Sequence, residues 1–408
     1  MASRHFKHWL KAYVTHTSHS EAPQMFHFWT GVSVIAGALR RQVWRDEQVF
    51  QWTPNFYIIL VAPPGIATKS TTVRHGMRLL EQVEGVHFGP QSTTWQALTE
   101  SLQDAMTEVP FGAGRTLPMS CVTCAISELG TFLKPDDVGL IDALTGLWDG
   151  QLETWGHKTK HSGSATIVNP WINIIGCTTP SWLRSNFPDS LVGAGFTSRV
   201  VFVYAETKRH LIAYPSLMME AEHYEDEQAL LVEDLQRIGE IKGNYQLTPE
   251  ALAWGVAWYE NLWTKQSDSK MAGDRFAGYR ARKQGHIHKL AMVIAASQRD
   301  ELLITEDDLI YADKITLNTE RDMMKVFESI TSSPMGPQIQ EVLSYIKAFD
   351  EITERALFQR CMKIMDEKQF NEALRSIIRA GYAARMPIIV PPTIQFLRDP
   401  EPEPTSDD

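Results

Sequence analysis

The stretch Asn55-Phe-Tyr-Ile-Ile-Leu-Val-Ala-Pro-Pro-Gly-Ile-Ala-Thr-Lys-Ser-Thr-Thr72 decides the fold that this sequence predicts. Tyr57 to Val61 is a β-branched and aromatic run typical of a buried strand, and it breaks into a tight loop at residues 62–65. The loop ends at Lys69-Ser70, and residues 71–84 have a helical pattern. A phosphate-binding loop has this order, because backbone N–H groups and a helix N-terminus then face the phosphates.

The loop departs from the standard pattern GxxxxGK followed by Ser or Thr. Pro63 and Thr68 stand where that pattern has glycine, so Thr68 is expected to adopt a backbone geometry that glycine adopts at lower cost. An ordinary strand-turn-helix with an incidental Lys-Ser is the alternative. Lys69 is expected to reach the outer phosphates of ATP, and the Ser70 hydroxyl is expected to bind Mg²⁺. The predicted nucleotide-binding residues of this segment are Pro64, Gly65, Thr68, Lys69, Ser70 and Thr71.

Composition restricts the class of protein. A length of 408 residues suggests two or three domains, and 43% hydrophobic with 22% charged residues is typical of a soluble globular chain. We find no apolar run long enough to span a membrane and no signal peptide, so we expect a cytoplasmic protein without a membrane partner. The net charge of −10 argues against a uniformly basic nucleic-acid coat protein, although it allows a local basic groove.

The cysteines offer one pair with metal or redox spacing, Cys121 and Cys124. This pair lies in an apolar run and has no second pair downstream, which favours buried, reduced thiols on a strand over a zinc site.

Two further predicted strands end in polar residues. Residues 118–128 end in Ser127-Glu128, and a carboxylate at a strand end can polarise an attacking water and help to place Mg²⁺. Glu128 is therefore the predicted catalytic base and a metal ligand, and a position next to a helix cap is the alternative. Ser127 stands where Asp is usual, which leaves only a hydroxyl to assist the metal. The strand at 171–178 ends in Thr178, which we expect to sense the γ-phosphate.

Residues 153–170 predict a β-hairpin, because two potential strands flank a basic tip between Gly156 and Gly163. Basic side chains can contact phosphates and a tryptophan can stack on a base, a combination suited to single-stranded DNA of any sequence. A solvated surface turn is the alternative. The candidate DNA-binding residues are Trp155, His157, Lys158, Lys160 and His161.

Arg199 follows a Gly-Phe turn and precedes the apolar strand 200–204. This position suits an arginine finger that neutralises charge at the nucleotide of a neighbouring subunit, and we favour Arg199 over Arg184 for that role. A salt-bridged turn arginine is the alternative.

These motifs, in this order, resemble those of the primase-associated P-loop ATPases of phages and mobile elements. The motifs are Pro54-Asn55-x-Tyr57 with its loop, Ser127-Glu128, Asn169-Pro170, Thr178-Thr179-Pro180 and Gly195-Phe196-x-Ser198-Arg199. A basic hairpin before a sensor strand also resembles the DNA-gripping hairpin of superfamily 3 hexameric helicases. The resemblance covers about residues 20–320 and implies a role in replication within a bacterial host. It also implies that Arg280 or Arg282, in the basic helix 274–297, reaches the nucleotide as a second sensor, and a solvated basic face is the equal alternative.

The predicted fold is α/β: a RecA/AAA+-like P-loop NTPase core with a central, mostly parallel sheet, flanking helices and a C-terminal winged-helix-like domain. It requires residues 57–61, 122–126 and 172–176 to be neighbouring strands of one sheet. Three helices followed by a Gly-turned ribbon suggest the winged helix, which serves either DNA or protein contacts. The predicted parts are a helical region at 1–50, the ATPase core at 51–212, a helical subdomain at 213–330, the winged-helix-like domain at 331–398 and an acidic disordered tail at 399–408.

The leading functional hypothesis is an ATP-dependent DNA helicase or translocase. It would act on single-stranded or forked DNA as a homo-oligomeric ring, expected to be a hexamer, with a primase or polymerase as a further partner. A helicase loader or replication scaffold with weak ATPase activity is the alternative. An ATPase without a nucleic-acid role is a third hypothesis, and the basic hairpin argues against it.

Overall fold

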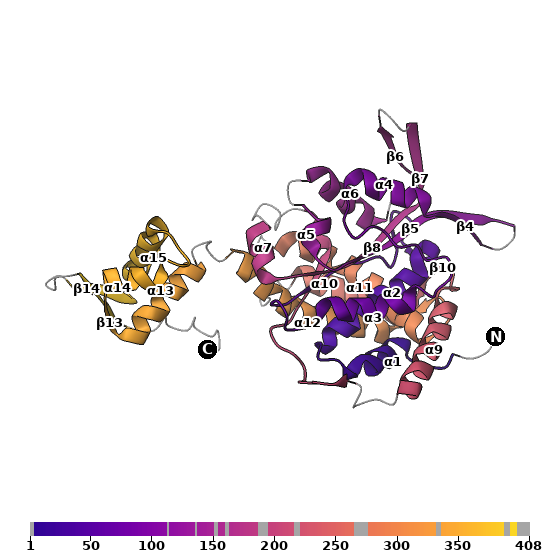
Figure 1. Ribbon diagram of the computed structural model, residues 1–408. Helices are drawn as coiled ribbons and strands as arrows, with labels where there is room; N and C mark the ends of the chain where they lie inside the picture. The colour runs from indigo at the N-terminus through magenta and orange to yellow at the C-terminus, as the bar shows by residue number, and fades with distance from the viewer. Residues whose placement is uncertain are drawn as a thin grey trace. The chain divides into compact units, whose positions relative to one another are not determined.

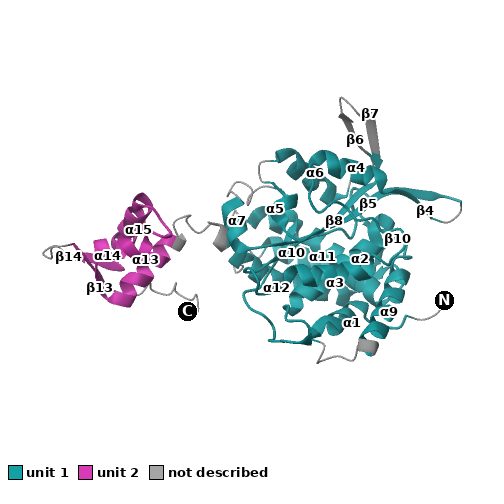
Figure 2. Cartoon of the chain, in the orientation of Figure 1, with its two compact units in different colours: residues 1–330 teal, residues 331–408 magenta. Residues whose placement is uncertain are grey.

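The computed structural model describes residues 4–111, 114–134, 137–150, 154–159, 163–186, 195–215, 221–264, 276–331, 336–386 and 392–397. The chain divides into two compact units, residues 1–330 and residues 331–408 (Figure 2). The division falls within the Ser- and Pro-containing stretch 329–337.

A five-stranded sheet lies at the centre of the first unit (Figure 1). Its order is β4 (Met106–Pro110), β5 (Thr116–Ile126), β8 (Pro170–Thr178), β3 (Tyr57–Val61) and β9 (Val200–Tyr204). Strands β5, β8, β3 and β9 are parallel, and β4 pairs antiparallel to β5 at the edge. The α/β class with a mostly parallel central sheet is therefore confirmed, as is the adjacency of the three predicted strands.

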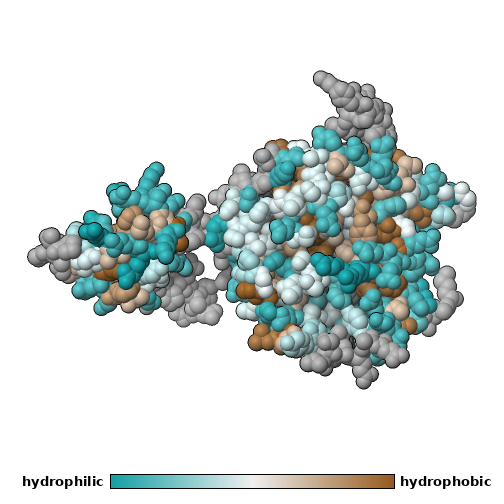
Figure 3. Space-filling view, in the orientation of Figure 1, coloured by the Kyte–Doolittle hydropathy of each residue, from teal (hydrophilic) through white to brown (hydrophobic). Residues whose placement is uncertain are grey.

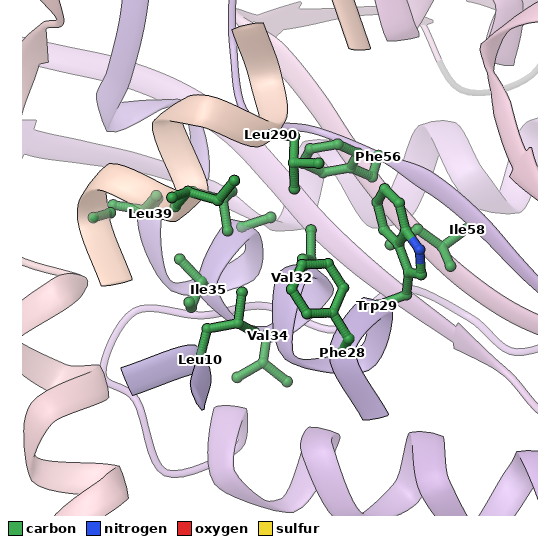
Figure 4. Close-up of a cluster of buried hydrophobic side chains, with 14 of the residues drawn as sticks. Leu10, Phe28, Trp29, Val32, Val34, Ile35, Leu39, Phe56, Ile58 and Leu290 are labelled. Carbon is green, nitrogen blue, oxygen red and sulfur yellow. The ribbon is translucent and has the colours of Figure 1, made fainter. Parts of the chain in front are cut away.

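The apolar character of β3 follows from its position. All five residues of β3 are buried, because helices cover both faces of a parallel sheet. Ile58 and Leu60 join a cluster with Trp29, Val32 and Ile35 of α2 (Gln24–Leu39). Figure 4 shows Ile58 beside these helical residues. Tyr57, Ile59 and Val61 point to the other face, where they pack with α4 (Trp95–Asp104) and α6 (Val138–Asp149).

The N-terminal and the later helical segments share the core of the sheet. Leu10 of α1 (Trp9–His16) and Leu290 of α11 (Ala277–Gln298) belong to the same buried cluster as Ile58 (Figure 4). Further helices of this unit are α3 (Lys69–Leu80), α5 (Leu129–Phe132), α7 (Pro180–Asn186), α9 (Ala221–Ile238), α10 (Pro249–Thr264) and α12 (Glu306–Thr331), with 3-10 turns η1 (Thr17–His19), η2 (Arg40–Gln42) and η3 (Thr197–Arg199). Residues 1–50 and 277–298 therefore help to build the core that positions the sheet.

Short strands and hairpins surround the sheet. β1 (Val43–Asp46) pairs with β2 (Gln51–Trp52) and with β10 (Gly243–Asn244), and β11 (Gln246–Leu247) pairs with β12 (Leu303–Ile304). β6 (Thr154–Thr159) and β7 (Gly163–Val168) form an antiparallel pair that projects from the unit, as does β4 (Figure 1). Within the described residues, no helix combines the length and the apolar character needed to cross a membrane.

The second unit contains three helices and a three-stranded antiparallel sheet. The helices are α13 (Gly336–Phe349), α14 (Glu354–Cys361) and α15 (Glu367–Arg379), and the strands are β13 (Glu351–Thr353), β14 (Ala383–Met386) and β15 (Thr393–Phe396) in the order β13-β15-β14. Asp366 and Gln369 form a capping box at the start of α15. Phe370, Leu374 and Ile377 of this helix face the core of the unit, so the apolar stripe of α15 holds the unit together.

Candidate functional site

A cavity of about 560 Å³ opens at the carboxyl ends of β3, β5 and β8. In parallel sheets this edge is where ligands bind. Seven of the predicted site residues line it: Pro64, Gly65, Thr68, Lys69, Ser70, Glu128 and Thr178. Tertiary structure thus brings together three segments that are about 50 residues apart in sequence.

The loop after β3 folds over its own lysine. Lys69 Nζ donates to Ala62 O at 2.7 Å and to Pro63 O at 3.3 Å. Burial lowers the pKa of Lys69, while the nearby Cys177 thiol and the Glu128 carboxylate act to raise it. Ala62 N donates to Thr178 O at 3.4 Å, which ties the loop to the end of β8. The ammonium group is therefore held inside the loop at the cavity wall.

Thr68 adopts the geometry expected from its place in the loop. Its φ of 43° and ψ of 36° lie in the left-handed region, which a β-branched residue rarely adopts. Gly65 also has a positive φ, 72°, at no comparable cost. The Thr68 carbonyl accepts hydrogen bonds from Thr72 N at 3.0 Å and from Thr72 Oγ1 at 3.1 Å, so the first turn of α3 holds this strained conformation.

Glu128 and Ser127 end β5 with exposed side chains that line the cavity. Glu128 directly precedes α5, but its carboxylate makes no capping hydrogen bond to that helix. Its backbone carbonyl instead accepts from Thr131 N at 3.1 Å and from Thr131 Oγ1 at 2.8 Å. The backbone therefore holds the turn, and the carboxylate faces the cavity.

The end of β8 supplies Thr178 and a tryptophan that the sequence analysis missed. Thr178 is 7% exposed and lines the cavity. Thr179 Oγ1 accepts from Trp182 N at 3.2 Å at the start of α7, and Trp182 also lines the cavity. A Cβ added to Gly130 would lie 2.6 Å from Trp182 Nε1, so Gly130 leaves the space for this ring. Trp182 follows the end of β8 closely in sequence, and this short separation could have indicated that its side chain lies near Thr178.

Thr71, Arg199 and Arg282 do not line this cavity. Thr71 is exposed on the first turn of α3. Arg199 lies just before Val200, which pairs with Tyr57 at the amino end of the sheet, so it is at the opposite edge. Arg282, half-buried on α11, has its pKa lowered by burial and by Arg199.

Arg199 makes an internal ion pair. Its side chain is 4% exposed, with Nη2 at 2.6 Å from Asp149 Oδ2 and Nη1 donating to Gly195 O at 2.6 Å. The guanidinium also lies 5.9 Å from the centroid of the Trp148 ring. In this conformation it is turned into its own subunit, so the predicted finger role, which stays a prediction, requires the Asp149 pair to open.

The basic segment of α11 is largely buried rather than a solvated face. Lys289 is fully buried, and its Nζ lies 2.6 Å from Asn55 Oδ1 and 2.7 Å from Trp148 O. Burial holds the pKa of Lys289 well below its usual range, against the opposing effect of Asp149. Lys283 Nζ lies 2.9 Å from Glu320 Oε1 of α12. These cations join α11 to the amino edge of the sheet and to α12.

The predicted hairpin forms, with Trp155, His157 and Lys158 on β6. Its register pairs Trp155 with Ile167 and Lys158 with Ser164. Lys160 and His161 lie outside the described residues. All four cysteines are free and buried, and burial raises the pKa of Cys121 to about 11 and of Cys124 to about 12, so these two side chains are buried thiols.

Among the described residues, no group of three or more His, Cys, Asp or Glu side chains could hold a metal ion alone. A magnesium ion with a nucleotide needs few protein ligands, because phosphate oxygens and water complete its shell. Ser70 and Glu128 on the cavity wall fit that requirement. Comparison of the whole sequence with protein-family models and with curated proteins finds no match.

Proposed function

We propose that this chain binds a nucleoside triphosphate, ATP, in the cavity at the carboxyl edge of the sheet and hydrolyses it. The proposal rests mainly on one observation. Four side chains line the same cavity: Lys69, Ser70, Glu128 and Thr178. A cation, a hydroxyl, a carboxylate and a second hydroxyl are the groups that phosphoryl transfer to water requires.

The loop and α3 suit a phosphate group. α3 has 12 residues and no acidic residue in its first turn, so its N-terminus favours an anion. Lys69 is the first residue of α3, and its Nζ, now bonded to two loop carbonyls, would exchange those carbonyls for phosphate oxygens. Mg²⁺ would neutralise charge on the phosphates, and Glu128 would accept the proton of the attacking water.

We further propose that the protein forms a ring-shaped oligomer, which uses ATP hydrolysis to move along single-stranded DNA. Strand β8 supports this idea, since it runs from the base of the β6–β7 hairpin at Pro170 to Thr178 in the cavity. One strand thus joins the nucleotide site to the hairpin that carries Lys158. Thr68 and Ser127, which replace the usual Gly and Asp, favour the second candidate, a helicase loader with weak ATPase activity.

ATP hydrolysis, with and without single-stranded DNA, tests the proposal. We expect Lys69→Ala to abolish hydrolysis, and Glu128→Gln to keep nucleotide binding while lowering turnover by a factor of 100 or more, on the order of that for loss of a general base. Glu81→Gln, an exposed acid just after α3, is the matched control and should behave as wild type. Unchanged turnover in Glu128→Gln would remove this residue as the base.

Strand displacement on a forked duplex separates the two candidate functions. A motor displaces the strand in an ATP-dependent manner, and displacement is lost in Lys69→Ala. A loader binds nucleotide and DNA without displacing a strand.

A further inference from the structure

Three hairpins converge at the amino side of the sheet. Figure 1 shows the β6–β7 pair projecting upward from the first unit and β4 projecting to the right. A cavity of about 370 Å³ lies where they meet, lined by Trp44 and Gln51 of β1–β2, Leu117 of β5, and Thr154 and Val168 of β6–β7. This cavity shares no lining residue with the nucleotide site.

An aromatic pair stands at this cavity. Trp44, which lines it, stacks on Phe111 with ring centroids 5.4 Å apart and an interplanar angle of 28°. Phe111 lies at the end of the β4–β5 hairpin, where its N–H donates to Arg115 O at 2.8 Å. Its side chain is 37% exposed, so part of the stacked pair faces solvent. Figure 3 shows apolar residues, in brown, interspersed with hydrophilic ones, in teal, on this face of the first unit.

The polar lining of the cavity suits the edge of a base. Gln51 and Asn169 contribute amides, which both donate and accept hydrogen bonds, and Thr53 and Thr154 contribute hydroxyls. Asn169 Nδ2 donates to Pro118 O at 2.8 Å, which fixes the orientation of that amide. Unstacked bases are recognised by this combination of an aromatic face and hydrogen-bonding side chains.

The charge of the lining favours an anionic strand. Among the described residues, no acidic side chain lines this cavity, and Arg41 is the one ionisable residue that does. Arg41 is 4% exposed, and its Nη1 donates to Pro170 O at 3.1 Å, at the start of β8. A volume of about 370 Å³ is at the small end of ligand sites and accommodates a single nucleoside.

We propose that this cavity binds one unstacked nucleoside of single-stranded DNA, with its base against Trp44, whose ring is held by its stacking on Phe111, at the root of the hairpin that carries Lys158. The inference rests on the proposed DNA role and adds a base-stacking contact to the backbone contacts of the hairpin. Every base has a face that can stack on an aromatic ring, and the lining amides both donate and accept hydrogen bonds, so the site accommodates more than one kind of base.

Fluorescence anisotropy with full-length protein tests the inference, using a labelled oligo-dT and the same oligonucleotide carrying abasic sites. We expect Phe111→Ala to weaken binding to oligo-dT at least about fivefold. The dependence of affinity on salt should stay unchanged, because no charge is removed, whereas Lys158→Ala should reduce it. Phe88→Ala, also 37% exposed but placed by a β-bridge beside Thr123 of β5, is the matched control and should bind as wild type.

The abasic oligonucleotide identifies the base as the group that is bound. Wild-type protein should prefer oligo-dT to the abasic strand, and Phe111→Ala should bind both equally. Equal affinity of Phe111→Ala and wild type, with weaker binding by Lys158→Ala, would overturn the base site and leave the DNA role intact. No binding of either strand by wild type with nucleotide present would overturn the DNA role itself. Preference for oligo-U over oligo-dT would overturn DNA as the occupant.

Discussion

Thr68 carries strain at the entrance to helix α3. Its φ of 43° costs a residue with a Cβ about 1–2 kcal/mol, and among the described residues its buried hydroxyl has no hydrogen-bond partner. We expect Thr68→Gly to raise the free energy of unfolding by up to about 1 kcal/mol, because the strain removed exceeds the added chain entropy of glycine. Chemical denaturation measures the change.

Thr71→Gly is the control for this substitution. Thr71 is exposed in the first turn of α3, and glycine there should lower the free energy of unfolding by roughly 0.3 kcal/mol, because threonine is itself a weak helix former. If both variants were destabilised equally, Thr68 would not be strained.

The ion pair of Arg199 allows a prediction about stability. Its buried guanidinium pairs with Asp149, whose carboxylate is 38% exposed. Loss of a buried partner costs roughly 3–5 kcal/mol, and solvent at Asp149 reduces this, so we expect Arg199→Ala to lower the free energy of unfolding by about 2 kcal/mol. Unfolding and ATP hydrolysis, both measured on one preparation of Arg199→Ala, distinguish the internal ion pair from the arginine-finger role. Full stability with lost hydrolysis would favour the finger role over the internal pair.

At the scale of elements, α5 and α7 contribute Gly130 and Trp182 to one wall of the cavity at the carboxyl edge of the sheet, where we propose that ATP binds. A Cβ on Gly130 would meet Trp182 Nε1 at 2.6 Å, and overpacking of this kind typically costs about 1–3 kcal/mol. We expect Gly130→Ala to displace the indole, to change tryptophan fluorescence and to weaken nucleotide binding about tenfold. Equilibrium binding of a fluorescent ATP analogue measures the effect.

Gly146→Ala on α6 controls for the change of glycine to alanine. Nothing lies within 4 Å of a Cβ added there, and alanine should stabilise the helix by up to about 1 kcal/mol without affecting nucleotide binding. Wild-type affinity in Gly130→Ala would show that this wall does not shape the site.

At the scale of the whole molecule, buried histidines link stability to pH. Burial lowers the pKa of His27, His286 and His288 to about 4 each, whereas an unfolded histidine titrates near its ordinary value of about 6.5. Between these values the unfolded chain binds protons that the folded chain does not. Stability should therefore be full above about pH 6.5 and should fall toward pH 4, by up to about 1.4 kcal/mol per pH unit for each histidine.

Thermal unfolding at pH 7 and pH 5.5 measures this dependence. His288→Phe keeps a ring beside Trp52, whose centroid lies 4.3 Å from that of His288, and should reduce the slope with pH. An unchanged slope in this variant would contradict the linkage.

Assembly is also a property of the whole molecule. A ring of about six subunits would gather Lys158 and Lys160 into one positive pore while the chain keeps a net charge of −10. We expect light scattering to show an oligomer with nucleotide and single-stranded DNA present. Lys158→Ala with Lys160→Ala should lose DNA binding and keep basal hydrolysis and oligomer size. A monomer under these conditions would rule out the ring.

The sequence by itself determined the central strands and most of the residues that line the cavity at the carboxyl edge of the sheet. Strands buried on both faces are continuous apolar runs, so β3, β5 and β8 were visible locally, and their polar ends had to meet at one edge of a parallel sheet. The strained backbone of Thr68 could also be predicted locally, because threonine stands at a loop position where the usual pattern has glycine.

Only the tertiary structure decided where the cations of α11 and Arg199 lie. Lys289 is compensated by Asn55 and Trp148, which are 234 and 141 residues away, and Arg199 by Asp149, which is 50 residues away. A buried charge requires a partner, and no local pattern in the chain identifies a partner at that separation. The contact between Trp44 and Phe111 could not be predicted either, because it forms only where two hairpins that are distant in sequence meet.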